Sequence, residues 1–220
     1  KVNTLANNYL AKAITDLNKQ SSGCDQTLLY TEMRKYFANH SQGELVKDIL
    51  YTEKVEKYVL PLKESVYGAW TPLNGYLLGK KSAASSPLAL SALIKIGDQK
   101  IGVDKLEHMF GTGFSYFTKH HLKGKSIESV LKNGVLLEKT ALGGNILATG
   151  VFAYGDLSAN FNGMRFWNHV LQKDDDILGS DQNLGPYVVC SGNKWEVSKS
   201  NPIDFKNYID ASMDESINCS

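Results

Sequence analysis

The sequence is poor in several features that would narrow its function at once. It has only three cysteines in 220 residues and no C-x-x-C pair, so no zinc or iron–sulfur site, and no cofactor of any kind, is predicted. Its formal net charge is +1 and no run is rich in lysine and arginine, which argues against a nucleic-acid partner. No apolar stretch approaches the ~20 residues that cross a bilayer, so no membrane span is predicted.

The sequence starts at Lys1 rather than at methionine, and we expect that a signal peptide has been removed from an exported protein, periplasmic or secreted. In an oxidising compartment two of the cysteines Cys24, Cys190 and Cys219 could form a disulfide and leave the third free. A bridge between Cys190 and Cys219 would fix the polar C-terminal tail. All three pairings remain open from the sequence.

Hydrophobic residues make up 42% of the chain and charged residues 21%, as in a folded domain, and the length suits one good core. We expect a single domain over residues 1–220 that acts as a monomer. Apolar residues at helical spacing predict an N-terminal helical scaffold over residues 1–66, with helices at Val2–Lys19, Leu28–Asn39 and Leu45–Leu62. The third helix should bend near Tyr51 or break at Pro61.

The middle and the end of the chain add small β elements to this scaffold. Residues 68–87 are irregular and fit a long loop, a groove lip with exposed aromatics, or core aromatics. A Gly-Asp turn predicts a hairpin between Ile94 and Val103, although Ser86–Ile94 could equally be a helix, and Ser191-Gly192-Asn193 predicts a second hairpin. The expected fold class is therefore mainly α (α+β). The last residues, from Phe205 to Met213, have helical spacing.

Asp104 and Glu107 form a predicted capping box, with Asp104 as the N-cap of a helix. The core stripe of that helix would contain Leu106, Phe110, Gly113 and Phe117. His108 lies on a different, partly polar face, where a structural hydrogen bond is its default role and catalysis the alternative.

The stretch from Ile127 to Lys139 predicts an amphipathic helix with one residue that breaks the pattern. At ~100° per residue, Glu138 falls within about 20° of Ile127, in the middle of an apolar stripe. A carboxyl group on a core-facing line would be desolvated and its pKa should rise, as a general acid needs at neutral pH. The alternative is a side chain that swings out at a frayed helix end.

Glycines at positions 143, 144 and 150 end this helix, and a second helix begins with Asp156 as its predicted N-cap. Between them, Leu147–Tyr154 is rich in β-branched and aromatic residues and predicts a short bent strand or hairpin beside the helix that carries Glu138. Ala159 and Gly163 on the second helix would let another helix approach closely.

A helix that ends in a glutamate and faces a β-hairpin resembles the lysozyme-like superfamily of peptidoglycan-cleaving enzymes. More narrowly, the strings DKLEHMFGTG, TGVFAYGDLSANFNGMRFW and MDESINCS resemble a family of bacterial envelope proteins. That family includes a lysozyme selective for deacetylated peptidoglycan, used by a predatory bacterium. The resemblance covers residues 101–220, the motif-bearing region.

The resemblance implies a glycosidase that cleaves peptidoglycan glycan strands, with a preference for deacetylated peptidoglycan. Glu138 would be the catalytic acid, and Asp156 is the candidate second carboxylate that activates water or stabilises the oxocarbenium ion. The expected substrate-binding residues are Tyr154, Asn160, Thr149 and His108. The alternative function is a non-catalytic envelope module that binds glycan or protein on the same scaffold.

Two acidic segments remain. The run Asp174–Asn183 lacks the spacing of an EF-hand and is interpreted as a solvated loop. Asp214 and Glu215 recur as a pair in the resembling family, and either could contact the amine of a deacetylated sugar if the C-terminal segment folds over the cleft.

Overall fold

The computed structural model describes the whole chain except residues 22, 66, 72, 74–90, 140–151 and 215–220. Its helices are α1 (Val2–Gln20), α2 (Gln26–Met33), α3 (Glu44–Tyr51), α4 (Val103–Phe110), α5 (Thr112–Phe117), α6 (Ile127–Lys139) and α8 (Tyr154–Leu171). A π-helical turn, Thr118–Leu122, follows α5. Two antiparallel hairpins pair β1 (Leu93–Ile96) with β2 (Gln99–Gly102) and β3 (Val188–Ser191) with β4 (Lys194–Val197). The mainly α class with small β elements is confirmed.

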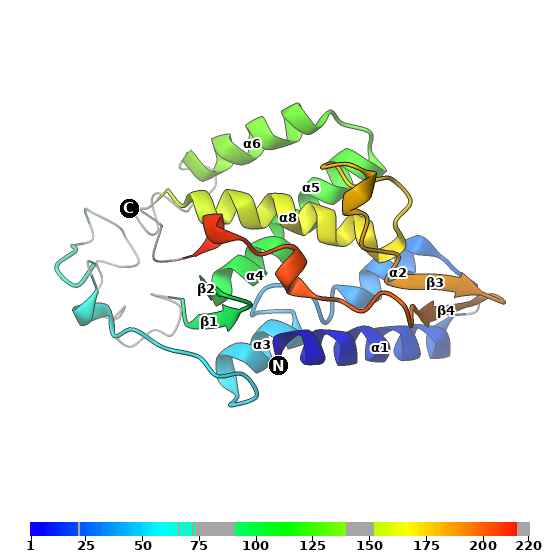
Figure 1. Ribbon diagram of the computed structural model, residues 1–220, viewed down its shortest axis with the longest axis horizontal. Coiled ribbons are helices and arrows are strands. Elements are labelled where there is room, and N and C mark those ends of the chain that lie inside the picture. The colour runs from blue at the N-terminus through cyan, green and yellow to red at the C-terminus, as the bar shows by residue number, and fades with distance from the viewer. Residues whose placement is uncertain (22, 66, 72, 74–90, 140–151, 215–220) are drawn as a thin grey trace.

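Helix α8 is the element around which the others pack. Figure 1 shows α8 crossing the middle of the molecule, with α6 on one side and α1 with the β3–β4 hairpin on the other. From Ala159 to Val170 nearly every residue of α8 is buried, polar ones included. An aromatic cluster fills the core around Phe166, whose ring centroid lies 5.6 to 5.9 Å from those of Phe37, Phe110 and Phe205.

Two glycines set the distance between α8 and the α4–α5 pair. A Cβ on Gly163 would stand 2.2 Å from the backbone oxygen of Met109, and one on Gly113 would stand 2.7 Å from the Cα of Gly163. Real Cβ atoms do not approach backbone this closely, so both positions need glycine. The prediction that Ala159 and Gly163 allow close helix approach is confirmed.

The N-terminal scaffold is shorter in its helices than the spacing predicts. α1 and the β1–β2 hairpin match their predictions closely, whereas α2 ends at Met33 and α3 at Tyr51. The hydroxyl of Thr52 bonds to the carbonyl of Asp48, 2.6 Å away, and the ammonium of Lys57 bonds to the carbonyl of Thr52. These bonds satisfy the end of α3 well before Pro61, so the predicted helix to Leu62 is wrong.

The disulfide joins Cys24 to Cys190, with 5.9 Å between the Cα atoms. The bridge considered above, between Cys190 and Cys219, is therefore wrong, and Cys24–Cys190 is the pairing of the three that forms. The cause lies in the turn after α1, which packs against the β3–β4 hairpin. Asn18 exchanges two hydrogen bonds with the backbone of Trp195, and the amide of Gly23 bonds to the carbonyl of Asn193. Cys219 lies outside the described residues.

Three further predictions need correction. α4 starts at Val103, directly after β2, with Gly102 as its N-cap, so Asp104 is not the cap. Glu107 instead accepts hydrogen bonds from the backbone and ring of His40. The segment from Phe205 to Met213 forms two short 3-10 turns rather than a helix, because Asp204 and Asp210 cap each turn with their side chains.

Candidate active site

Glu138 lies on the buried line of α6, as predicted. α6 has the predicted bounds, and its buried residues are Val130, Gly134 and Glu138, spaced four apart on one face. The side of α6 that carries Leu136 and Leu137 is exposed. Glu138 is only 6% exposed, although it is one residue from the helix end. The alternative of a glutamate that swings out from a frayed end is therefore wrong.

Gly134 makes room for the hydroxyl of Tyr116 beneath α6. A Cβ on Gly134 would stand 1.5 Å from that oxygen, so the tyrosine from α5 occupies the space where a side chain would be. Gly134 is one helical turn before Glu138, which brings the hydroxyl near the carboxyl group. Burial raises the pKa of Tyr116, against a hydrogen bond from Asn160 that lowers it. Tyr116 therefore keeps its proton at neutral pH.

A chain of polar side chains leads from Tyr116 across α8 to α4. Asn160 on α8 is hydrogen-bonded to Tyr116. The Oδ1 atom of Asn160 lies 3.1 Å from Nδ1 of His108. The Nε2 of His108 lies 3.3 Å from Oδ2 of Asp156. The ammonium of Lys105 lies 2.9 Å from Oδ1 of the same carboxylate and 2.7 Å from Asp104. We call Lys105, Asp156, His108, Asn160 and Tyr116 the His108 network.

The charges of this network are fixed by its own contacts. Burial alone would lower the pKa of His108, but the hydrogen bond and charge of Asp156 outweigh it and raise the pKa to about 9. For Asp156, burial opposes ionisation, yet His108 and Lys105 hold the pKa of the carboxyl well below its usual value. At neutral pH the network therefore contains two cations around one buried carboxylate.

Asp156 does not cap α8. The helix begins at Tyr154 with Ala153 as its N-cap, which places Asp156 inside the first turn with its side chain turned inward. Two cations from α4 lie against its carboxylate, and their attraction explains why this acid is buried. The prediction of an N-cap aspartate is wrong for this reason.

The remaining predicted site residues lie in different settings. Tyr154 is 70% exposed at the start of α8, with its ring centroid 4.9 Å from that of Phe152. Asn160 is buried inside the His108 network rather than open to a ligand, and His108 keeps 20% of its side chain exposed. Thr149 and all of the predicted β segment before Phe152 lie outside the described residues.

Sequence reasoning missed Lys105 and Tyr116. A signal for Tyr116 exists, because a glycine on the apolar stripe of α6 leaves a gap that a neighbouring side chain must fill. Lys105 gives no such signal, since a lysine in the first turn of a helix is ordinarily solvated. Its side chain is only 3% exposed here, because Asp104 and Asp156 both lie against its ammonium group.

A second buried network lies further along α8. Asp176 accepts two hydrogen bonds from Nε of Arg165 and lies 2.9 Å from Nε2 of His169. The hydroxyl of Tyr208 lies 2.6 Å from Nδ1 of His169 and bonds to the hydroxyl of Tyr187. We call these five residues the His169 network. The side chains of His169 and Asp176 are fully buried, so this network has no access to a substrate, and the predicted solvated acidic loop is wrong at Asp176.

No helix in the described part of the chain is long and apolar enough to span a membrane. Within the same residues, no group of three or more histidine, cysteine, aspartate or glutamate side chains could hold a metal ion.

No family model, no curated protein and no solved structure matches the chain.

Proposed function

We propose that this protein is a glycosidase that cleaves the glycan strands of bacterial peptidoglycan, with Glu138 as the general acid. The observation that carries the proposal is the burial of this carboxyl group at the end of α6, one turn from the hydroxyl of Tyr116. Burial disfavours the ionised form of a carboxylic acid, and a glycosidase needs a protonated carboxyl group to protonate the leaving oxygen.

The His108 network would hold Tyr116 in place beside Glu138. As a cation, His108 donates from both ring nitrogens, to Asp156 and to Oδ1 of Asn160. This leaves the amide nitrogen of Asn160 to donate to Tyr116, whose hydroxyl then has its own proton to offer to a nearby acceptor. Each group fixes the orientation of the next, and the last member lies at Glu138.

Asp156 suits a positioning role better than that of a second catalytic carboxylate. A nucleophile or general base needs a free oxygen that faces the substrate. Both oxygens of Asp156 lie against cations, and the side chain is 9% exposed. We therefore propose that Glu138 acts on the glycosidic oxygen and that Asp156 holds His108.

A preference for deacetylated peptidoglycan remains part of the proposal, and Asp156 is not the group that would contact the sugar amine. Its charge is already matched by Lys105 and His108. Asp214 accepts a hydrogen bond from the backbone of Lys100, 3.0 Å away, and Glu215 lies outside the described residues.

The disulfide between Cys24 and Cys190 supports the proposed export, because such bonds persist in oxidising compartments.

The test is digestion of defined peptidoglycan, acetylated and deacetylated, with separation and mass analysis of the fragments. Glu138→Gln should stay folded and lose at least about a hundredfold in rate, since the amide keeps the shape and has no transferable proton. The matched control is Glu128→Gln, on the same helix but 74% exposed and paired with Lys132, which should keep full activity.

Cleavage by Glu138→Gln at the wild-type rate would exclude the general-acid role. Wild-type protein that binds the glycan without releasing fragments would instead support the non-catalytic envelope module. Equal cleavage of acetylated and deacetylated substrate would remove the selectivity from the proposal and leave the rest.

A further inference from the structure

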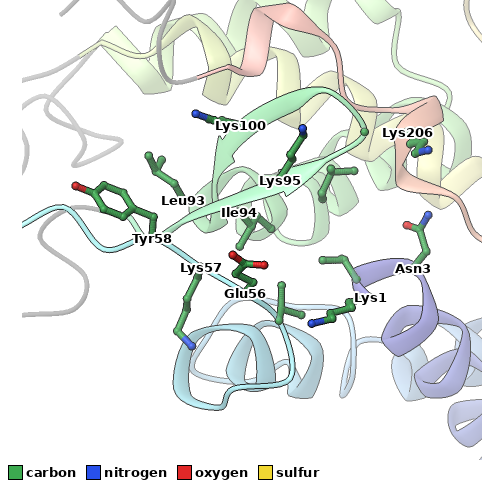
Figure 2. Close-up of a pocket in the computed structure, with 14 residues that line it drawn as sticks. Lys1, Asn3, Glu56, Lys57, Tyr58, Leu93, Ile94, Lys95, Lys100 and Lys206 are labelled. Atoms are coloured by element: carbon green, nitrogen blue, oxygen red, sulfur yellow. The ribbon is translucent and has the colours of Figure 1, made fainter.

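A separate concave site lies at the edge of the β1–β2 hairpin and shares no residue with the His108 network. It is a cavity of about 680 Å³ between β1 and residues 55–58. The two segments pair only at Tyr58 and Leu93, whose backbones exchange hydrogen bonds of 2.9 and 2.8 Å. On the side of Lys95 and Glu56 they diverge, and the cavity is the wedge between them (Figure 2). We call it the β1 wedge.

The β1 wedge contains an edge position of the hairpin that has no partner. In an antiparallel pair, alternate residues direct their backbone groups toward the partner strand and away from it. Leu93 directs its groups away from β2, to Tyr58, so Lys95 two residues later directs its own groups to the same open edge. Within the described residues, nothing bonds to the backbone N–H or C=O of Lys95.

Positive charge lines the rim of the β1 wedge. Lys95 and Lys100 are directly opposite each other in the hairpin, and the side chain of Lys206 passes Gly97 at the turn. Figure 2 shows these three side chains spread along one side of the cavity rather than gathered at a point. No carboxylate of a described residue forms an ion pair with any of the three, and like charges opposite each other in a hairpin are unfavourable.

The other lining residues offset little of this charge and supply an apolar surface. The side chain of Lys57 points away from the rim (Figure 2), and its ammonium bonds to the carbonyl of Thr52 at 2.6 Å and lies 3.8 Å from Oε1 of Glu53. Glu56 is the acid among the lining residues, and its carboxylate points into the cavity (Figure 2). Tyr58 is 58% exposed at the mouth. Apolar side chains complete the lining: Val2, Val55, Leu93, Ile94 and Ile96.

We propose that the β1 wedge binds an extended acidic peptide segment of a partner protein, which adds a short strand to the open edge of β1. The free backbone groups of Lys95 would pair with the peptide backbone, as in other cases of strand addition. Side chains of an extended peptide alternate between its two faces, so acidic residues can face the lysine rim while apolar ones face the floor. The free backbone edge is what favours a peptide over another polyanion.

The experiment measures binding of a labelled Glu-Val-Glu-Val-Glu-Val peptide to the full chain by fluorescence anisotropy at low salt. Three comparison ligands separate the contributions. A Lys-Val alternating peptide reverses the charge, an analogue with proline in place of the first two valines removes backbone donors, and a heparin fragment supplies charge without a peptide backbone.

The acidic peptide should bind, and the double variant Lys95→Glu with Lys100→Glu should weaken it roughly tenfold or more. Lys123→Glu, an exposed lysine in another loop, is the matched control and should leave affinity unchanged. Glu56→Gln should tighten binding a few-fold, because it removes the carboxylate among the described lining residues of the cavity. Bound peptide should also slow hydrogen exchange of the Lys95 amide.

Three results would overturn the proposal. The first is no binding of the acidic peptide at low salt. The second is equal binding of the proline analogue or of heparin without protection of the Lys95 amide, which would show a charged surface only. The third is undiminished affinity in the double variant, with Lys95→Gln and Lys100→Gln repeating the measurement if the charge reversal prevents folding.

Discussion

The two histidine networks each pair a histidine with an aspartate and each have members on α8, yet at neutral pH one histidine is a cation and the other is neutral. The pKa of His108 is raised to about 9, whereas the pKa of His169 is lowered to about 4. In each network the imidazole lies beside an aspartate, and that aspartate also contacts a lysine or arginine. An aspartate neighbour therefore does not by itself decide whether a histidine is charged.

Burial and the partner of the second ring nitrogen explain the difference. Burial lowers the pKa of His169, whose side chain is fully enclosed, and Arg165 adds to this against the attraction of Asp176. Nδ1 of His169 faces the hydroxyl of Tyr208, which can donate to a neutral ring. Nδ1 of His108 faces the carbonyl oxygen of Asn160, which can only accept and so favours the protonated ring. One network is a structural core and the other holds a cation at neutral pH.

The largest expected effect comes from removing the aspartate of each network. Asp176→Asn would leave the guanidinium of Arg165 buried without a counter-charge, and we expect a loss of ~3–5 kcal/mol in the free energy of unfolding. Asp156→Asn should cost less, ~1–3 kcal/mol, because His108 can release its proton and Lys105 still contacts Asp104. Urea unfolding of both variants checks the order.

The control for this pair is Asp181→Asn, an exposed aspartate in the same loop as Asp176, which should change stability by less than ~0.5 kcal/mol. A larger loss for Asp156→Asn than for Asp176→Asn would contradict the contrast drawn between the two networks.

The next effect concerns how the free energy of unfolding depends on pH, with His169 responsible for the acidic limb of the curve and His108 for the alkaline limb. Because the folded pKa of His108 is raised, its contribution is complete below about pH 6.5 and is lost as the pH rises through about 9. Because the folded pKa of His169 is lowered, its contribution is present above about pH 6.5 and is lost as the pH falls toward about 4. Each limb should amount to a few kcal/mol.

Unfolding midpoints measured from pH 4 to pH 10 check both limbs, and His108→Gln should flatten the alkaline one. The matched control is His120→Gln. The ring of His120 bonds to the carbonyl of Lys125 at the surface, and its replacement should leave the profile unchanged. A ring resonance of His108 that titrates at or below pH 6.5 in an NMR experiment would refute its assignment as the charged histidine.

The smallest expected effect concerns the contact between the hydroxyl of Tyr116 and Gly134 on α6. Gly134→Ala should displace the hydroxyl of Tyr116 and cost ~1–3 kcal/mol of stability, although alanine in an unobstructed helix would gain up to ~1 kcal/mol. Asn133→Ala, the exposed neighbour on the same helix, is the matched control and should be neutral or slightly stabilising. Stabilisation by Gly134→Ala would mean that Tyr116 does not occupy this space.

Local patterns predicted the parts of the fold that depend on neighbours in sequence. The bounds of α6 and the inward position of Glu138 follow from helical spacing, and the two hairpins follow from their turn residues. These predictions held because one face of each element is buried and its turn chemistry is local. The close approach of another helix at Gly163 was predicted for the same reason, since a small residue on a helix face has few other uses, but which helix approaches was not predicted.

Predictions failed where a contact that no local pattern contains decided the outcome. Asp104 and Asp156 both look like N-caps, yet cations from neighbouring positions and helices draw their carboxylates elsewhere. Asp176 lies in an acidic run that looks solvated, and only the position of Arg165 across the fold shows why it is buried. The Cys24–Cys190 pairing depends on how the β3–β4 hairpin packs on α1, which no local pattern contains.

The contact between Gly113 and Gly163 determines where mutations would affect the candidate site. A Cβ on Gly113 would also stand 3.1 Å from the backbone oxygen of Asn160. The lack of a side chain at both glycines therefore allows the close helix crossing and also determines where the backbone of Asn160 lies. A random-mutation screen for loss of the His108 network should therefore find many inactivating substitutions at Gly113 and Gly163, although neither residue has a polar side chain. Such a screen would map the supports of the site as well as its chemistry.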